Sequence, residues 1–387
     1  MRSSRLFRLV VGLVCLALGR VGVEAASPGT RTMKQSFPAG AELRLANLAG
    51  AIEIVAGKGS QISVEAVVHA LGDSEPETQR LLQGMSWVEA RDKKGREEWA
   101  LSYPVRDFDT FSYPRSNDSG WWGGDSRTQI HYLGERVNVV SSTRRAPTLY
   151  ADLRIEVPAG ARFAIRLGAG TVDSGRTSGG LEIDTGSGDV AVDFHEGRLL
   201  VDTGSGNVEV GEAREDAAID TGSGDVKVTR MSGRGLVDTG SGNVEVGFFQ
   251  GTTLSIDTGS GDVRVGSGST GSLDVDTGSG DIRVEGLEME SFRGDTGSGD
   301  VVVRTSLAKT RDMLVDTGSG SVKILGGADA SFDLEAEQGS GELVVGYSDA
   351  QFKVRRGREV YGATRGDRRT KIRVDTGSGD CVLQPNT

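Results

Sequence analysis

The chain has 387 residues, with 55 acidic and 44 basic side chains and a formal net charge of −11. Such an acidic surface argues against nucleic acid as a partner. The two cysteines, Cys15 and Cys381, are too few for a cysteine-type zinc site, and Cys15 lies in an expected leader, so no internal disulfide remains in the mature chain.

Residues 1–25 have the pattern of a secretory signal peptide. Three arginines precede an apolar run at 9–19, and Val23-Glu24-Ala25 fits a small-residue cleavage site. The apolar run is too short to span a membrane. We expect cleavage after Ala25, a secreted, periplasmic or cell-surface location, and no transmembrane segment in the mature chain.

Residues 26–165 predict an N-terminal β region. Residues 43–54 carry a strand–glycine–strand pattern, which is a worn form of the repeats that follow. Ser74-x-x-Glu77 is a capping pattern and predicts a short helix at 74–85. Strands are expected at 86–90, 97–103 and 149–158.

The stretch 104–147 is an insert without a clear period, rich in aromatic and acidic side chains. Trp121, Trp122, Tyr113 and Asp118 are candidates for ligand contact, because aromatic rings stack on sugars and carboxylates bind their hydroxyl groups. The alternative is that the aromatic rings pack against the first coils and close the core. A catalytic carboxylate pair would need a fixed separation, and nothing in this stretch sets one.

Asp-Thr-Gly-Ser-Gly occurs nine times in residues 166–387, and the copies begin at Asp184, Asp202, Asp220, Asp238, Asp257, Asp276, Asp295, Asp316 and Asp375. Neighbouring copies are 18 to 21 residues apart, except for a final gap of 59 that holds a worn copy at 337–341. A fixed period near 20 is the signature of a solenoid, in which each repeat forms one coil stacked on the next.

Within one coil, Leu181, Ile183, Val190 and Val192 alternate with polar residues on either side of a Gly-Ser-Gly corner. Alternation of period two predicts two short strands with the aliphatic side chains inward and the acidic side chains in water. The predicted fold is all-β: a parallel β-solenoid (β-helix) of coils of 18–21 residues, with a small helix and an irregular insert near the N-terminus.

Each copy places two acidic positions near its corner. The first Asp is expected to accept backbone N–H groups as an Asx turn. Carboxylates in adjacent coils, ~4.8 Å apart, repel by roughly 3–4 kcal/mol at an effective dielectric constant of 20. Calcium held between coils by Asp184, Asp189, Asp202, Asp220 and Asp225 is therefore an alternative. No other cofactor is implied.

Residues 353–373 reverse the charge, with nine basic side chains against two acidic ones. Arg355, Arg356, Arg358, Arg368 and Arg369 form either a solvated loop or a contact patch for an anionic polymer or a neighbouring acidic rod. The near-consensus copy at Asp375 is expected to be the last coil. Its open edge would allow end-to-end self-association, and Cys381 should be buried inside it.

The layout resembles a large bacterial family of unknown function, labelled putative adhesin and built of β-strand repeats. The matching segments are Asn47-Leu48-Ala49-Gly50-Ala51-Ile52-Glu53-Ile54, Val157-Pro158-Ala159-Gly160 and the Asp-Thr-Gly-Ser-Gly-Asp-Val copies. They cover most of the mature chain except 104–147. The resemblance implies a repeat fold and adhesion, and it carries no catalytic residues.

We therefore expect a secreted or cell-envelope protein that acts as a non-catalytic adhesin or surface scaffold on a cell-surface polymer or protein. One alternative is a polysaccharide-acting β-helix enzyme, which the regular repeats disfavour. Another is an envelope-stress sensor that binds an amphiphile through the aromatic insert.

Overall fold

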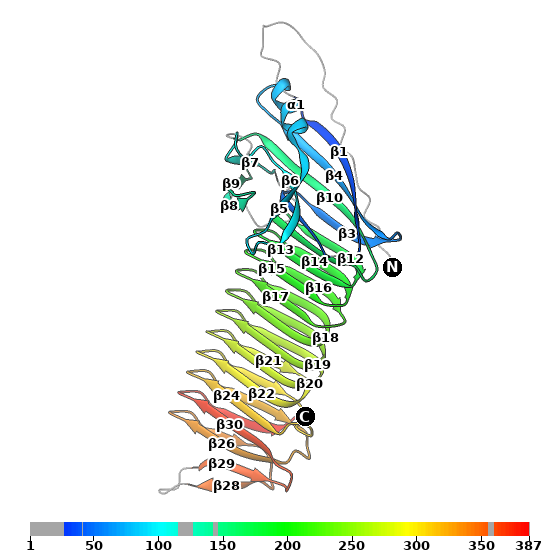
Figure 1. Cartoon of the computed structure of the whole chain (residues 1–387). Coiled ribbons are helices and arrows are strands. Elements are labelled where there is room, and N and C mark those ends of the chain that lie inside the picture. Colours follow the sequence, from blue (N-terminus) through cyan, green and yellow to red (C-terminus); the bar gives the residue numbers. More distant parts are fainter. Residues whose placement is uncertain (1–26, 41, 115–126, 142–145, 355–359, 387) are drawn as a thin grey trace, which may run out of the picture.

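The structure is a computed structural model that describes residues 27–40, 42–114, 127–141, 146–354 and 360–386. The described residues form 31 strands and one helix, so the predicted all-β class is confirmed. Most of the strands lie across a long rod, and the helix and the first strands form a cap at one end of it (Figure 1).

The rod has two parallel ladders of strands joined by the Gly-Ser-Gly corners. The first ladder holds, in spatial order, β2 (Leu43–Ala49), β11 (Arg162–Ala169), β13 (Gly180–Thr185), β15 (Leu199–Thr203), β17 (Ala217–Thr221), β22 (Leu287–Thr296), β24 (Asp312–Thr317), β30 (Thr370–Thr376) and β26 (Phe332–Gln338). The second ladder holds β3 (Ile52–Gly57), β12 (Val172–Ser178), β14 (Val190–Glu196), β16 (Val208–Ala213), β21 (Ile282–Glu285), β23 (Val301–Arg304), β25 (Val322–Gly326), β31 (Cys381–Pro385) and β27 (Leu343–Val345).

Three long strands in the middle of the rod contribute to both ladders: β18 (Val226–Thr239), β19 (Val244–Thr258) and β20 (Val263–Thr277). Pairing is in register with the repeat, so that Asp184 lies beside Asp202, and Asp202 beside Asp220. Equivalent residues of successive coils therefore form straight columns along the rod.

The corner glycines are set by how closely the coils stack. Gly188 has a φ of 141°, and a Cβ atom there would lie 1.6 Å from the carbonyl oxygen of Gly170 in the preceding coil. A Cβ on Gly186 would lie 2.6 Å from the carbonyl oxygen of Gly168. The glycines are thus required by close backbone approach, in addition to the positive φ that only glycine adopts readily.

The corner threonines point inward and link neighbouring coils. Thr277 Oγ1 donates a hydrogen bond to the carbonyl oxygen of Gly261 (2.9 Å) and accepts one from the N–H of Gly280 (3.1 Å). The expected Asx turn is therefore wrong: the N–H of the second glycine binds the threonine hydroxyl in the corners at Gly261, Gly280, Gly299 and Gly320, and the carbonyl oxygen of a serine in the next coil at Gly188, Gly206 and Gly224.

The aliphatic side chains predicted to face inward form the core. Leu181, Ile183, Val190 and Val192 are all buried, and their counterparts in the other coils belong to the same hydrophobic cluster. One coil cannot bury its aliphatic face alone, so stability comes from the contact of each coil with its neighbours.

The cap covers the first coil. Antiparallel strands β1 (Gly29–Pro38), β4 (Gln61–Leu71) and β10 (Thr148–Pro158) extend the second ladder, and the hairpin of β5 (Ser86–Arg91) and β6 (Glu97–Ser102) extends the first. The helix expected at 74–85 is α1 (Glu75–Gly84), with Ser74 as its N-cap. The coil of β2 and β3 stacks on β11 and β12. The domain boundary expected at residue 166 therefore does not divide the stack.

The described part of the insert packs against the cap and the first coil. It contains β7 (Thr110–Ser112), β8 (Arg127–Tyr132) and β9 (Glu135–Val140). Phe111 and Tyr132 are fully buried, and the Tyr132 hydroxyl donates to the carbonyl oxygens of Ala46 (3.1 Å) and Leu101 (2.7 Å). These contacts match the expectation that aromatic side chains of the insert close the core.

The C-terminal repeat is not the last coil of the stack. Strands β30 and β31 lie between β24 and β25 on one side and β26 and β27 on the other. The outermost coil contains the worn copy at 337–341, and a hairpin of β28 (Gln351–Val354) and β29 (Val360–Arg365) covers its first ladder (Figure 1). The expectation that the near-consensus copy forms an open end is wrong, because its strands have neighbours on both sides. Cys381 is fully buried there as expected, and burial raises the pKa of its thiol to about 12.

Candidate binding face

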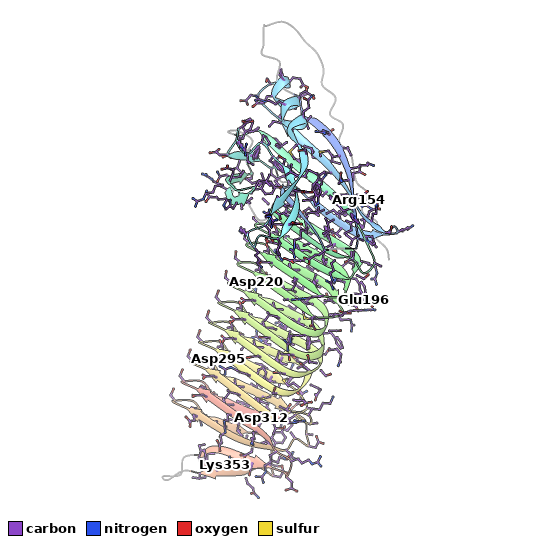
Figure 2. All side chains as sticks on the ribbon, viewed as in Figure 1. Arg154, Glu196, Asp220, Asp295, Asp312 and Lys353 are labelled. Atoms are coloured by element: carbon purple, nitrogen blue, oxygen red, sulfur yellow. The ribbon has the colours of Figure 1, made fainter. Side chains whose placement is uncertain are left out.

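The first ladder presents a flat outer face along the rod. Side chains that alternate with the buried aliphatic positions project from it. Asp220 and Asp295 lie at the same edge of the rod, and Glu196 lies at the opposite edge (Figure 2). We call the row of leading aspartates the face column: Asp184, Asp202, Asp220, Asp238, Asp257, Asp276, Asp295, Asp316 and Asp375.

The carboxylates of the face column have few partners. Among the described residues, only Asp295 has a hydrogen bond or ion pair, which comes from the guanidinium of Arg293 (Nη2–Oδ2 3.2 Å). Burial, followed by repulsion from Asp184, raises the pKa of Asp202; burial and Asp202 likewise raise the pKa of Asp220. Burial and neighbouring carboxylates also raise the pKa of Asp276 and Asp316. Repulsion between neighbouring carboxylates thus contributes to these raised pKa values, while Lys93 and Lys94 act in the opposite direction on Asp184 and Asp202 and partly offset it.

A second row of acceptors behaves differently. We call it the turn column: Asp189, Asn207, Asp225, Asn243, Asp262, Asp281, Asp300, Ser321 and Asp380. Each acceptor oxygen receives the backbone N–H of the next coil, as from Asn207 to Asp189 Oδ1 (2.9 Å) and from Glu342 to Asp380 Oδ1 (2.9 Å). This column therefore joins the coils structurally.

The calcium candidates divide between the two columns. Asp184, Asp202 and Asp220 belong to the face column, whereas Asp189 and Asp225 each have one carboxylate oxygen bound to a backbone N–H. In the described part of the chain, no three His, Cys, Asp or Glu side chains come together as a metal site. Calcium binding stays a prediction, and a calorimetric titration without a shift in melting temperature would reject it.

A groove of about 620 Å³ crosses the face below the turn between β5 and β6. Leu200, Ala218 and Leu236 lie in it as outward residues of successive coils, and Leu236 is 47% exposed. Lys93 and Lys94 of the turn line its upper end. The groove thus combines an apolar row, cations at one end and the face column along it.

Ion pairs hold the β5–β6 hairpin on this face. Arg96 pairs with Asp92 (2.6 Å) within the turn and with Glu182 (3.2 Å) on β13, and Arg44 also pairs with Glu182 (3.0 Å). Burial alone would raise the pKa of Glu182, but the two guanidinium groups lower it. Glu182 is therefore a structural anion that fixes the upper wall of the groove.

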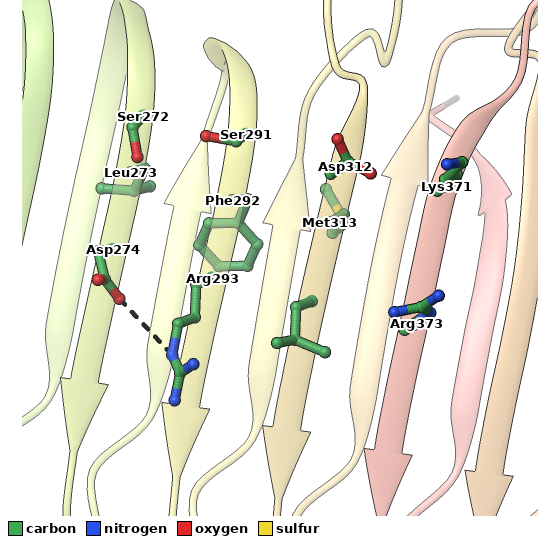
Figure 3. Close-up of a pocket in the computed structure, with 11 residues that line it drawn as sticks. Ser272, Leu273, Asp274, Ser291, Phe292, Arg293, Asp312, Met313, Lys371 and Arg373 are labelled. Atoms are coloured by element: carbon green, nitrogen blue, oxygen red, sulfur yellow. Dashed lines mark ion pairs between the residues drawn. The ribbon is translucent and has the colours of Figure 1, made fainter.

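A smaller groove of about 330 Å³ lies farther along the same face (Figure 3). Arg293 Nε approaches Asp274 Oδ1 at 3.9 Å, and Lys371 and Arg373 enter from β30, which the chain places next to β24. Leu314 is 41% exposed between Arg293 and Arg373. Strand β30 thus brings cations to a mostly acidic face.

The structure places only some of the other sequence candidates. Arg368 and Arg369 are exposed in the turn before β30, whereas Arg355, Arg356 and Arg358 lie outside the described residues. Trp121, Trp122 and Asp118 also lie outside them. The ring of Tyr113 is half-buried, 5.0 Å from the ring of Tyr150. The described structure therefore places no two of the insert's four contact candidates together.

Sequence reasoning missed the groove beneath the β5–β6 turn. The available signal was the run of leucine or alanine at outward positions 200, 218 and 236, because Glu182 precedes this run in the ladder and Ser255, Asp274 and Arg293 follow it. The lysines at the upper end of the groove belong to a hairpin that lies more than 100 residues before Leu200 in the chain. No local pattern connects the two.

Comparison with known proteins places the chain in a family. Its sequence matches Toastrack DUF4097 over residues 151–246 and 198–384, which together make up more than half of the chain. No match was found among curated proteins. Among the described residues, no helix is long and apolar enough to cross a membrane.

Several solved structures are similar to the chain. A putative adhesin from Parabacteroides distasonis is 11% identical, with 92% of this chain and 98% of that chain covered and a TM-score of 0.35. A putative lipid binding protein from the same species is 14% identical, with 92% and 97% covered and a TM-score of 0.34. A putative adhesin from Bacteroides fragilis is 10% identical, with 91% and 96% covered and a TM-score of 0.28. The family match confirms the resemblance seen in the repeats: the chain belongs to the Toastrack family, DUF4097.

Proposed function

We propose that this protein is a parallel β-solenoid of the bacterial cell envelope, exported by its N-terminal leader, that acts by surface contact as a non-catalytic adhesin or scaffold. The face column is the contact surface, and its partner is a cell-surface polymer or protein that presents cations or hydrogen-bond donors. One observation carries the proposal: nine aspartates are stacked in one column, and within the described residues no hydrogen bond to the backbone explains them.

The regularity of the face supports contact rather than catalysis. A column of identical groups suits a repeating ligand, because each coil adds an equivalent weak contact and the contacts act together. Catalysis by a carboxylate pair needs two acids in different environments at a defined separation. Within the described residues, the face column offers the same local setting again and again.

The test compares two charge-matched variants. The face variant carries Asp184, Asp202, Asp220 and Asp276→Asn, and the turn variant carries Asp189, Asp225, Asp262 and Asp300→Asn. The turn variant is the control because Asn207 and Asn243 already make the same backbone bond. Binding to an array of glycans that includes amino-sugar polymers should fall at least about tenfold for the face variant only, which corresponds to about 1.4 kcal/mol.

An equal loss in both variants would show that only net charge matters, and it would contradict a contact role for the face column. Absence of binding by the unaltered chain to any amino-sugar polymer or polycationic surface would reject the proposal. Release of reducing sugar ends from polysaccharides would contradict its non-catalytic part.

A second candidate is binding of an amphiphile, favoured by the apolar row of Leu200, Ala218 and Leu236 below Lys93 and Lys94. An acyl chain would lie along the row with its anionic head near the lysines. Titration with lysophosphatidylglycerol below its micellar concentration tests this candidate. Leu236→Glu should abolish the heat of binding, and a heat that is unchanged by this substitution would contradict it.

A further inference from the structure

The order of coils at the distal end differs from their order in the sequence. The chain passes from β24 and β25 directly to the outermost coil of β26 and β27, and it returns through β28 and β29. Residues 370–385 then lie in the space between the coil of β24 and β25 and the coil of β26 and β27. We call these residues the inserted coil and the space they fill the slot.

Backbone hydrogen bonds hold the inserted coil on both sides. On the side of β24 and β25, the N–H of Lys371 donates to the carbonyl oxygen of Arg311 (2.8 Å), and the N–H of Val322 donates to that of Asp380 (2.8 Å). On the other side, the N–H of Cys381 donates to the carbonyl oxygen of Glu342 (2.9 Å). An empty slot would leave strand edges unpaired on both walls, and such edges readily pair with another strand.

The slot is complementary to one kind of segment. The turn column continues through the slot. The N–H of Asp380 donates to Ser321 Oγ (3.3 Å), and the N–H of Glu342 donates to Asp380 Oδ1 (2.9 Å). A Cβ on Gly379 would lie 1.9 Å from the carbonyl oxygen of Gly320. A segment that fills the slot therefore needs the corner glycines and an acceptor directly after them, which this repeat supplies.

The connection to the inserted coil is suited to act as a hinge. Before it, Arg365 ties β29 to the loop between β27 and β28 through an ion pair with Asp349 (2.6 Å) and lies 4.9 Å above the ring of Tyr347. Residues 366–369 are exposed, and Gly366 has a φ of 72°. The anchored hairpin and the inserted coil are thus separated by a short exposed turn that can change conformation alone.

We propose that the inserted coil is exchangeable: it leaves its own slot and fills the slot of a second copy of this chain, so that two rods join at their distal ends. Every backbone bond and buried side chain lost in one copy is regained in the other. The free-energy difference between the closed chain and the exchanged pair is therefore confined to the hinge and to association. The proposal goes beyond the contact function, because an exchanged dimer carries two face columns where the closed monomer carries one.

Cys381 provides the test, because its partner in β25 is Val322. Residues paired in adjacent strands lie ~4.8 Å apart, within reach of a disulfide. The probe variant is Val322→Cys in a Cys15→Ser chain. After incubation of the whole protein at high concentration, dilution and oxidation, the closed form gives a disulfide within one chain and the exchanged form gives a covalent dimer on a non-reducing gel.

The control variant carries Val301→Cys and Val322→Cys with both native cysteines replaced by serine. Val301 and Val322 are paired in the same ladder, but they lie in coils that follow each other in sequence. Covalent dimer that increases with concentration in the probe variant and stays absent in the control is the expected result. Dimer in neither variant, or equally in both, would overturn the proposal.

A hinge deletion gives an independent readout that needs no oxidation. Removal of Asp367 and Arg368 prevents the inserted coil from reaching its own slot without strain, and shortened hinges favour exchange between copies. The dimer fraction in size-exclusion chromatography should increase at least about tenfold, which corresponds to about 1.4 kcal/mol. A folded, strictly monomeric deletion variant would also contradict exchange.

Discussion

The two acidic columns lie five residues apart in each repeat, but they differ in chemistry. The turn column contains Asp, Asn and Ser, and each accepts a backbone N–H from the next coil. In the face column, aspartate occurs in all nine copies, and among the described residues only Asp295 has a side-chain partner. The variable column is therefore structural, and the invariant one is not explained by hydrogen bonding.

This difference shows how a repeat separates two requirements. The turn position needs an acceptor oxygen, so a neutral amide or hydroxyl serves as well as a carboxylate. At the face position, burial and neighbouring carboxylates raise the pKa of Asp202 and Asp220, so folding disfavours their charged form. An aspartate kept in all nine copies despite this cost supports the proposed contact role.

The largest expected effect comes from breaking the turn column. Asp189, Asp225, Asp262 and Asp300→Ala should lower the free energy of unfolding by about 4 kcal/mol, because each lost hydrogen bond contributes about 1 kcal/mol net. The same four positions changed to Asn should lose less than about 1 kcal/mol in total. Urea unfolding measures both, and an equal loss for the Ala and Asn variants would remove the structural role of this column.

The next effect concerns the corner that holds both columns in register. Gly206→Ala should cost at least about 3 kcal/mol, because φ is 145° and the new Cβ would lie 2.2 Å from the carbonyl oxygen of Gly188. Gly286→Ala isolates the cost of the backbone angle, since φ is 91° but nothing lies within 4 Å of the new Cβ. It should cost only about 1–2 kcal/mol by urea unfolding. Equal losses would show that close stacking does not select the glycine.

The smallest effect is a pH dependence that belongs to the face column. A carboxyl group whose pKa is raised by folding stabilises the folded chain fully below its unfolded pKa of about 3.9, and this stabilisation is lost as pH rises through the folded pKa. The face variant should therefore melt at a higher temperature than the unaltered chain at pH 7, with the difference vanishing towards pH 4. A difference in melting temperature that is independent of pH, or of opposite sign, would contradict repulsion between the carboxylates of the face column.

The sequence could predict the repeated part of the molecule because each coil is encoded locally. Alternation around Leu181 to Val192 identifies the inward side chains, and the corner glycines identify the turns. The expected Asx turn is wrong because aspartate and threonine both offer an acceptor oxygen beside the corner. Only the structure shows that the threonine side chain turns inward and accepts the bond.

Contacts between distant segments could not be read from local patterns. The β5–β6 turn reaches the groove through ion pairs of Arg96 with Glu182. The C-terminal coil takes an interior place, and the worn copy at 337–341 forms the outermost coil, in which β26 pairs with β30 on one side and with β29 on the other. Nothing local distinguishes an interior repeat from a final one, so the order of coils had to come from the structure.

The interior coils present nearly the same upper and lower surfaces to their neighbours, whereas each end of the rod has its own dedicated cover. Unequal recombination within the repeated part of the gene would then add or remove whole coils in the middle and leave both covers intact. Each event would change the reach of the molecule by ~4.8 Å without creating a new fold. The length of the rod can therefore change without a change of fold. We expect homologues whose rods differ in length but keep the covers at both ends.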